Sequence, residues 1–257
     1  MRKILHLPVT SVPAYGILTA ARMQDKWSVE GLNAILQSIE VQEKKENAWF
    51  TIYIGKYRNI SLFAAQHPIG CPGTEIMLEE LYSAGARCII RLGSCFGILA
   101  KSSDIVVPTK VRIGEVGIAS YYGFPFRSEL EFNHEIVKKI ELQLRKNKLK
   151  FKKGVIYSSD SFISPVKRAN ELAKQGILAA EMECCAFALW NKMHKDARSA
   201  CILVVDGDLK RVKACIANKW VREYAMKRYR DCVKACLQTF LFLEKIITFN
   251  PSLKIAI

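Results

Sequence analysis

The chain has 257 residues, and its 39 Lys and Arg against 24 Asp and Glu give it a net charge of +15. Hydrophobic residues make up 50% of it, which excludes an intrinsically disordered chain, and 14 Gly and 8 Pro exclude a collagen-like one. No run reaches the roughly 20 apolar residues of a membrane helix, and the N-terminus lacks the apolar stretch of a secretory signal. We therefore expect a cytoplasmic protein without membrane association.

Short β-rich runs alternate with amphipathic helical patterns, and no linker or repeat divides them, so we expect one domain over residues 1–257. Strands are predicted at Val12–Ala20, Trp49–Lys56, Ile60–Gln66, Arg87–Gly93, Ile105–Ile113, Gly154–Ser159, Gly176–Ala180 and Ser199–Asp206. Helices are predicted at Val29–Ile39, Gly73–Ala84, Asn133–Arg145, Val166–Lys174, Glu183–Lys195 and Ala214–Ile246. The apolar run Cys201–Val205 is typical of a sheet buried on both faces. This alternation predicts a three-layer α/β sandwich.

Cysteine and histidine usage argues against metal and redox chemistry. The nine cysteines are scattered and form no C-x-x-C pair, so reduced thiols in a cytosolic protein are the better interpretation. The four histidines, at positions 6, 67, 134 and 194, form no H-E-x-x-H or H-x-H array. We therefore expect no metal site.

Positive charge is concentrated in two segments. Lys138–Lys153 holds eight basic residues and one acid, and Lys210–Arg230 holds eight more against Glu223. Such stripes could bind nucleic acid or be solvated helix faces, and the second interpretation is favoured because no zinc finger or RNP motif is present. The positive field would attract a small anionic substrate such as phosphate.

Ligand sites in α/β folds lie at the carboxyl ends of strands, so the polar residues found there are the candidates. Arg91 precedes a Gly/Ser turn, which suits an anion, although a strand-end Arg can simply pair with a carboxylate. Glu181 and Glu183 open a helix, where they can cap it or accept two vicinal sugar hydroxyls. Asp206 closes an apolar strand, where it can donate a proton or cap the next turn.

In this order, the segments resemble the family of hexameric purine nucleoside phosphorylases and uridine phosphorylases, and most closely its malaria-parasite type. The family's R-x-G-[ST] phosphate turn is similar to Arg91-Leu92-Gly93-Ser94, and Arg22 matches the Arg of its phosphate loop. Its second phosphate Arg, supplied across a dimer interface, falls at Lys45. The resemblance implies that orthophosphate is the co-substrate, that these residues bind it, and that no cofactor or metal is required.

The nucleoside residues follow from the same resemblance. The E-M-E ribose motif reads Glu181-Met182-Glu183, and the aromatic of the S-S-D-x-[FY] segment, which stacks on the base, is Phe162. His6 matches a histidine that reaches the neighbouring subunit's site, and Asp206 matches the purine-type proton donor in V-D-G. The resemblance implies a central twisted mixed sheet and a dimer-based oligomer, expected to be a hexamer.

Several positions depart from the family. The glycine-rich G-D-P-x-R loop reads Leu18-Thr19-Ala20-Ala21-Arg22, its G-x-G turn reads Pro68-Ile69-Gly70, and Phe96 stands where the base pocket has Gly. Leu and Ala let backbone N–H groups approach an anion less well than Gly does. Lys45 supplies charge without the bidentate fork of Arg.

The resemblance implies reversible phosphorolysis of a purine nucleoside, of the inosine or guanosine kind, to free base and ribose 1-phosphate. The segment Pro165-Val166-Lys167-Arg168 lacks the Gln with which uridine phosphorylases read uracil, and this favours purine. The alternatives are a uridine or thio-nucleoside phosphorylase and a non-catalytic nucleoside-binding paralogue.

Overall fold

The computed structural model describes residues 6–20, 26–208 and 219–249. In chain order its elements are β1 (Tyr15–Ala20), α1 (Lys26–Leu36), β2 (Glu40–Glu46), β3 (Thr51–Tyr57), β4 (Ile60–His67), α2 (Cys71–Ser83), β5 (Cys88–Gly97), β6 (Ile105–Ile113), α3 (Gly117–Tyr121), β7 (Glu129–Glu131), α4 (His134–Lys146), β8 (Phe151–Ser158), α5 (Ser164–Lys167), α6 (Ala169–Lys174), β9 (Ala179–Glu181), α7 (Cys184–Met193), β10 (Arg198–Asp208) and α9 (Lys219–Phe249).

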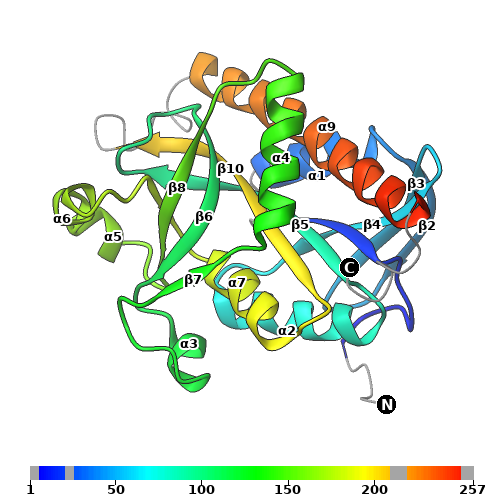
Figure 1. Cartoon of the computed structure of the whole chain (residues 1–257), viewed down its shortest axis with the longest axis horizontal. Helices are drawn as coiled ribbons and strands as arrows, with labels where there is room; N and C mark the ends of the chain where they lie inside the picture. The colour runs from blue at the N-terminus through cyan, green and yellow to red at the C-terminus, as the bar shows by residue number, and fades with distance from the viewer. Residues whose placement is uncertain (1–5, 21–25, 209–218, 250–257) are drawn as a thin grey trace.

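A single hydrogen-bonded sheet contains all of these strands, in the order β10-β6-β8-β9-β5-β1-β4-β3-β2, with β7 added beside β6. It holds parallel and antiparallel pairs. Helices α1, α4 and α9 cover one side of it, and α2, α3 and α7 lie on the other (Figure 1). The expected α/β/α arrangement around a mixed sheet is confirmed.

Five strands of this sheet close on themselves, which the sequence did not predict. β10 pairs with β6 on one side and with β5 on the other, and β5 returns through β9 and β8 to β6. The ring uses a very short strand, β9, which runs antiparallel to β5 and parallel to β8. Because β9 runs antiparallel to β5, the chain that leaves β9 points back toward the earlier residues of β5 and not beyond Gly97.

Strands β4, β1 and β5 run parallel, and their register determines which side chains share a face. Leu18 of β1 lies opposite Ala65 of β4 and opposite Arg91 of β5. Because side chains alternate between faces with a period of two, His67 lies on the same face of the sheet as Arg91. Only β1 separates β4, which carries His67, from β5, which carries Arg91, so these two strands lie about 10 Å apart.

The main difference from the predicted elements is β2. Its sequence, Glu40–Glu46, is mostly charged and is exposed throughout, and it forms the edge of the sheet beside β3. An edge strand with charged side chains is protected from pairing with other chains, but it has no apolar alternation to reveal it. The short elements α3 and β7 also lie outside the predicted set.

The core is built from the central strands and the helix faces packed on them. Residues 201–205 of β10 are entirely inaccessible to solvent, as expected for a strand covered on both sides. The long helix α9 buries its apolar stripe, which includes Cys232, Cys236 and Phe240. Among the described helices, none combines the length and the apolar character that a membrane crossing requires.

Candidate functional site

Arg91 is the centre of a buried cluster that holds two carboxylates, those of Glu181 and Glu183. Its side chain is 1% exposed, and it contacts four groups. Nη2 donates to Glu183 Oε2 at 2.5 Å, and Nε donates to His67 Nε2 at 3.2 Å. Nη1 lies 3.6 Å from Glu181 Oε2 and also 3.6 Å from Cys184 Sγ. The buried guanidinium therefore neutralises two buried carboxylates. Each of these charges, if it were buried alone, would carry a large desolvation cost.

Glu183 is held from two directions. Its Oε2 accepts the bond from Arg91, and its Oε1 accepts the backbone N–H of Gly70 at 2.9 Å. Gly70 has φ 84°, a left-handed conformation that glycine adopts without strain, and it directly precedes α2. The turn before α2 thus positions the carboxylate at the start of α7.

Glu181 caps the start of α7. Its Oε2 accepts the backbone N–H groups of Glu183 and Cys184, at 2.7 and 2.8 Å. Its Oε1 is fully buried and has no hydrogen-bond partner among the described residues. Burial, together with the nearby charge of Glu183, raises the pKa of Glu181, although Arg91 opposes this. Among the described residues, this oxygen is therefore a buried carboxylate acceptor without a hydrogen bond.

Asp206 lies inside β10, which continues two residues beyond the predicted strand end, to Asp208. The register between β10 and β5 shifts between Val205 and Gly207, so Asp206 is the extra residue of a β-bulge. Bulges re-aim side chains and occur next to active sites. Val205 lies opposite Cys95 and Gly207 opposite Phe96, so Asp206 lies beside β5, the strand that carries Arg91. Burial, and next the charge of Asp206, raise the pKa of the Cys95 thiol. Ser94, also on β5, is half-buried.

The segment after β8 uses most of its polar groups internally. Ser159 Oγ donates to Glu115 at 3.0 Å, and Asp160 accepts the backbone N–H of Gly117 at 3.0 Å. Phe162, in contrast, is 75% exposed, so its ring remains available to stack on a ligand. Met182, between the two glutamates, is half-buried.

His6 and Lys45, the two residues expected to act in a neighbouring subunit, lie far from Arg91 in their own chain. Lys45 is on β2, and three strands separate β2 from β5, which amounts to about 19 Å. It forms an exposed ion pair with Glu43. His6 Nδ1 bonds to Glu80 at 2.6 Å, near the other end of α2 from Gly70.

His6 nevertheless lies close to the end of β2, the strand that carries Lys45. Asn47, at the turn between β2 and β3, donates to the backbone oxygen of His6 at 2.8 Å. The ring of His6 packs 4.7 Å from that of Trp49, which is 66% exposed. The structure thus brings His6 and the end of β2 onto one surface. This is required if His6 and Lys45 both enter the active site of a neighbouring subunit. Arg22 lies outside the described residues.

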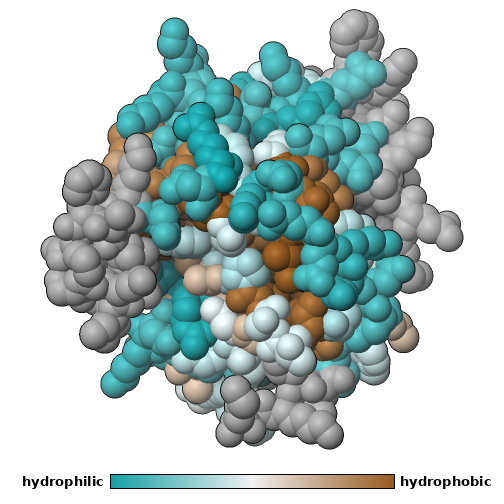
Figure 2. Space-filling model, turned by 90° about the vertical axis from the view of Figure 1, so that its right-hand side faces the viewer, coloured by the Kyte–Doolittle hydropathy of each residue, from teal (hydrophilic) through white to brown (hydrophobic). Residues whose placement is uncertain are grey.

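On the side of the molecule that carries β2 and β3, hydrophobic residues gather in a band between hydrophilic ones (Figure 2). Val41 of β2 and Trp49 are among the exposed large hydrophobic side chains. Exposed apolar surface of this kind marks interaction sites.

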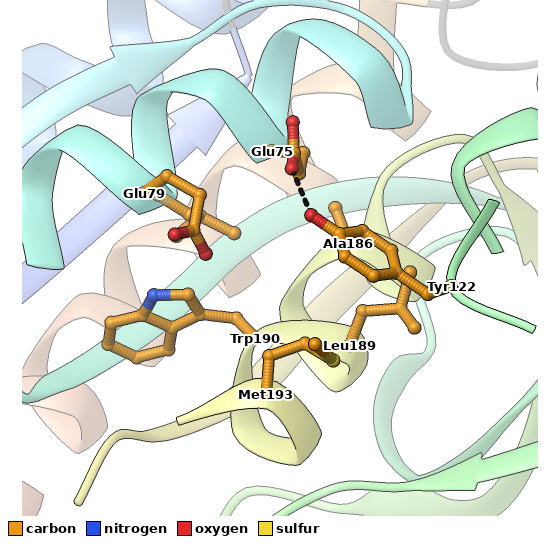
Figure 3. A pocket seen from close by; sticks show the side chains of 8 residues that line it. Glu75, Glu79, Tyr122, Ala186, Leu189, Trp190 and Met193 are labelled. Atoms are coloured by element: carbon orange, nitrogen blue, oxygen red, sulfur yellow. Dashed lines mark hydrogen bonds between the residues drawn. The ribbon is translucent and has the colours of Figure 1, made fainter. Parts of the chain in front are cut away.

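A separate depression lies between α2, α3 and α7, with about 210 Å³ of space that is open to solvent (Figure 3). Tyr122 donates to Glu75 at 2.7 Å, and the indole nitrogen of Trp190 faces Glu79 across the gap. None of the expected site residues lines it. Within residues 6–20, 26–208 and 219–249, no cluster of three or more His, Cys, Asp or Glu could hold a metal ion.

His67 and Gly70 contact the cluster of Arg91 and Glu183, a role not expected from the sequence, in which Gly70 was noted only as the end of a turn that departs from the family. His67 follows the predicted strand Ile60–Gln66 directly, and that position at a strand end was the available signal. Without the strand order, however, nothing in the sequence indicates that it faces Arg91.

The chain matches the Phosphorylase superfamily over residues 22–238. It is 31% identical over 160 residues to a 5'-methylthioadenosine/S-adenosylhomocysteine nucleosidase of Buchnera aphidicola, covering 57% of this chain and 67% of that protein. It is 26% identical to a purine nucleoside phosphorylase (DeoD-type 2) of Vibrio cholerae, covering 73% of this chain and 78% of that protein. The fold is similar to that of the uridine phosphorylase of Vibrio fischeri, with a TM-score of 0.78 at 22% identity over 93% of this chain and 97% of that one.

Proposed function

This chain belongs to the Phosphorylase superfamily, and we propose that it catalyses the reversible phosphorolysis of purine nucleosides to free base and ribose 1-phosphate. The observation that carries the proposal is the buried cluster of Arg91 with Glu181 and Glu183, set beside the bulged Asp206. Purine nucleoside phosphorylases are among its relatives, at 25–26% identity over about three quarters of this chain.

The two glutamates suit the sugar. A ribose presents two vicinal hydroxyls, and each needs an acceptor that stays fixed while positive charge develops on the ring. Glu183 is fixed by Arg91 and Gly70, and Glu181 has a buried oxygen without a partner among the described residues. Met182 would pack against the apolar face of the sugar, with His6 of a neighbouring subunit at the 5′ end.

Phosphate would bind on the other side of the sugar. Arg91 has five N–H groups and four described partners, and in this proposal the remaining N–H group binds a phosphate oxygen once substrate opens the buried cluster. Arg22, Ser94 and the Lys45 of a neighbouring subunit would complete the site. The positive charge of these residues is needed to hold phosphate, the nucleophile, against C1′ of the ribose.

The base would stack on Phe162, and Asp206 would give a proton or a hydrogen bond to purine N7 as negative charge develops there. Neither a metal nor a cofactor takes part in this mechanism.

We further propose that the active form is a dimer-based oligomer, with the hexamer of the similar family as the expected assembly. A cytoplasmic location agrees with the eight described cysteines, all free thiols.

Hydrolysis of a thio-nucleoside is the second candidate. It is favoured by the 31% identity to a nucleosidase and by Leu18 and Ala20, which replace residues of the glycine-rich phosphate loop. Water would then replace phosphate as the nucleophile.

One experiment separates the candidates. The protein is incubated with inosine, uridine or 5'-methylthioadenosine, with and without phosphate; released base is measured by chromatography and the sugar product by ³¹P NMR. Ribose 1-phosphate formed only with phosphate, and fastest from inosine, supports the proposal. Base released equally without phosphate supports the hydrolase. No base from any substrate at any protein concentration would overturn both and leave a binding protein.

A further inference from the structure

His67 is a completely buried histidine whose tautomer is fixed by its surroundings. Its Nδ1 lies 2.8 Å from the backbone oxygen of Pro68, and Thr74 Oγ1 donates to the same oxygen at 3.1 Å. A carbonyl oxygen can only accept, so Nδ1 carries the proton. The other ring nitrogen, Nε2, therefore presents a lone pair.

That lone pair faces Arg91. Arg91 Nε donates to His67 Nε2 at 3.2 Å, and both residues lie on the same face of the sheet. Nε belongs to the guanidinium plane, so a hydrogen bond there limits rotation of the plane about the end of the side chain. The two terminal nitrogens are then directed to Glu183 and to Glu181.

The neighbours of His67 favour the neutral ring. Burial, followed by the charge of Arg91, lowers the pKa of His67 to about 4, against the opposing effect of Glu183. Besides these charged groups, the ring meets Thr74 of α2 and the edge of Phe187 of α7, 5.7 Å away. A protonated ring would place its charge against the guanidinium and would lose the acceptor.

We propose that His67 is a positioning residue that fixes the orientation of Arg91, and through it the carboxylate of Glu183, for the sugar and phosphate of the substrate. The inference rests on the proposed function, because the reaction gives this alignment its purpose. Loss of the acceptor would let the guanidinium turn while the fold stays intact. Groups that orient metal ligands from behind typically change affinity or activity 10-fold to 100-fold when they are mutated, and we expect an effect of that size here.

The test compares His67→Leu, which removes the acceptor, with His67→Gln, whose amide oxygen can replace Nε2. The matched control is His194→Leu, because His194 is also largely buried and bonded to a charged group, Glu79 at 2.7 Å, but lies outside the Arg91 cluster. If His67→Leu does not fold, His67→Asn takes its place, since its shorter amide also fails to reach Arg91.

Two readouts are measured. The first is the ¹⁵N resonance and hydrogen exchange of the Arg91 Nε–H group, assigned by its loss in Arg91→Lys. The second is kcat and KM for nucleoside and for phosphate. We expect His67→Leu to lose the slowly exchanging Nε–H and to lower kcat/KM about 10-fold to 100-fold, mainly through kcat, with His67→Gln restoring most of both.

The outcomes are distinct. A protected Nε–H and unchanged kcat/KM in His67→Leu would overturn the inference, as would equal losses in His67→Leu and His67→Gln. If the wild-type protein releases no base from any nucleoside, the proposed function fails, and the NMR comparison still decides whether His67 fixes Arg91.

Discussion

The guanidinium of Arg91 occupies the space in which a side chain at position 93 would stand. A Cβ built on Gly93 would lie 2.6 Å from Arg91 Nη1 and 2.7 Å from its Cζ. The glycine of the R-x-G segment is therefore needed for the placement of the arginine two residues before it, on the same face of β5. Its lack of a side chain, not its backbone freedom, is what matters here.

Gly93→Ala should consequently destabilise the protein. The added methyl group must displace a guanidinium that is bonded to Glu183 and His67, and such overpacking typically costs about 1–3 kcal/mol. Urea denaturation measures the loss. Gly117→Ala is the control, because the nearest atom to its new Cβ is 4.0 Å away. Equal midpoints for Gly93→Ala and the wild type would contradict this account.

Asp206→Asn should lower kcat for inosine by about 10²-fold or more, because the amide keeps the shape but cannot give up a proton. Asp208→Asn is the matched control on the same strand: Asp208 accepts the backbone N–H and the hydroxyl of Ser102, at 2.7 and 2.8 Å. Its activity should stay near that of the wild type. Full activity of Asp206→Asn on inosine would reduce Asp206 to a structural role in the bulge.

Glu183→Gln should weaken both binding and turnover of ribonucleosides. The neutral amide loses the charged bond to Arg91 and accepts from sugar hydroxyls through only one oxygen. Substrates without the 2′- or 3′-hydroxyl should show a smaller penalty, which steady-state kinetics on inosine and its deoxy analogues can measure. Equal losses on both kinds of substrate would assign this carboxylate to the protein's own structure and not to the sugar.

Stability should fall on acidification because of His67. Its pKa is about 4 in the folded protein and about 6.5 in an unfolded chain. Between these values the unfolded state binds more protons, so the free energy of unfolding rises with pH, by at most about 3 kcal/mol across the window. This contribution is present above pH 6.5 and disappears as the pH falls toward 4. Denaturation at a series of pH values should give a flatter curve for His67→Gln; parallel curves would refute the assignment.

Mixing two inactive proteins tests the shared site. Lys45 belongs to the surface near His6, and Asp206 to the β10 bulge, so each site would draw them from different subunits. After exchange between Asp206→Asn and Lys45→Ala proteins, mixed dimers hold one site with both wild-type residues and should regain part of the activity. A fully active monomer in sedimentation, or proven exchange without recovery, would rule out this arrangement.

Much of the fold could be predicted because its signals are local. The apolar run of Cys201–Val205 indicated a buried strand, and the structure confirms it. Glu181-Met182-Glu183 was placed at a strand-to-helix junction, where β9 and α7 meet. In both cases neighbouring residues alone determine the pattern.

The remainder depends on pairing between distant segments. β2 is a strand only because β3 lies beside it, and its own sequence is mostly charged and is exposed. Arg91 was expected near the end of its strand, but β5 continues to Gly97 because β9 and β10 extend the pairing. His67 became a site residue through the strand order, which no local pattern encodes.

Closure of the five-strand ring has a consequence for how the chain folds during synthesis. β5 is made early, yet its partner β10 lies at residues 198–208, so this pairing must wait until most of the chain has been translated. Contacts so distant in sequence form slowly, and until then β5 presents an unpaired, apolar edge. Chains that end before Arg198 should therefore aggregate, and the late arrival of β10 is where we expect a chaperone to be needed most.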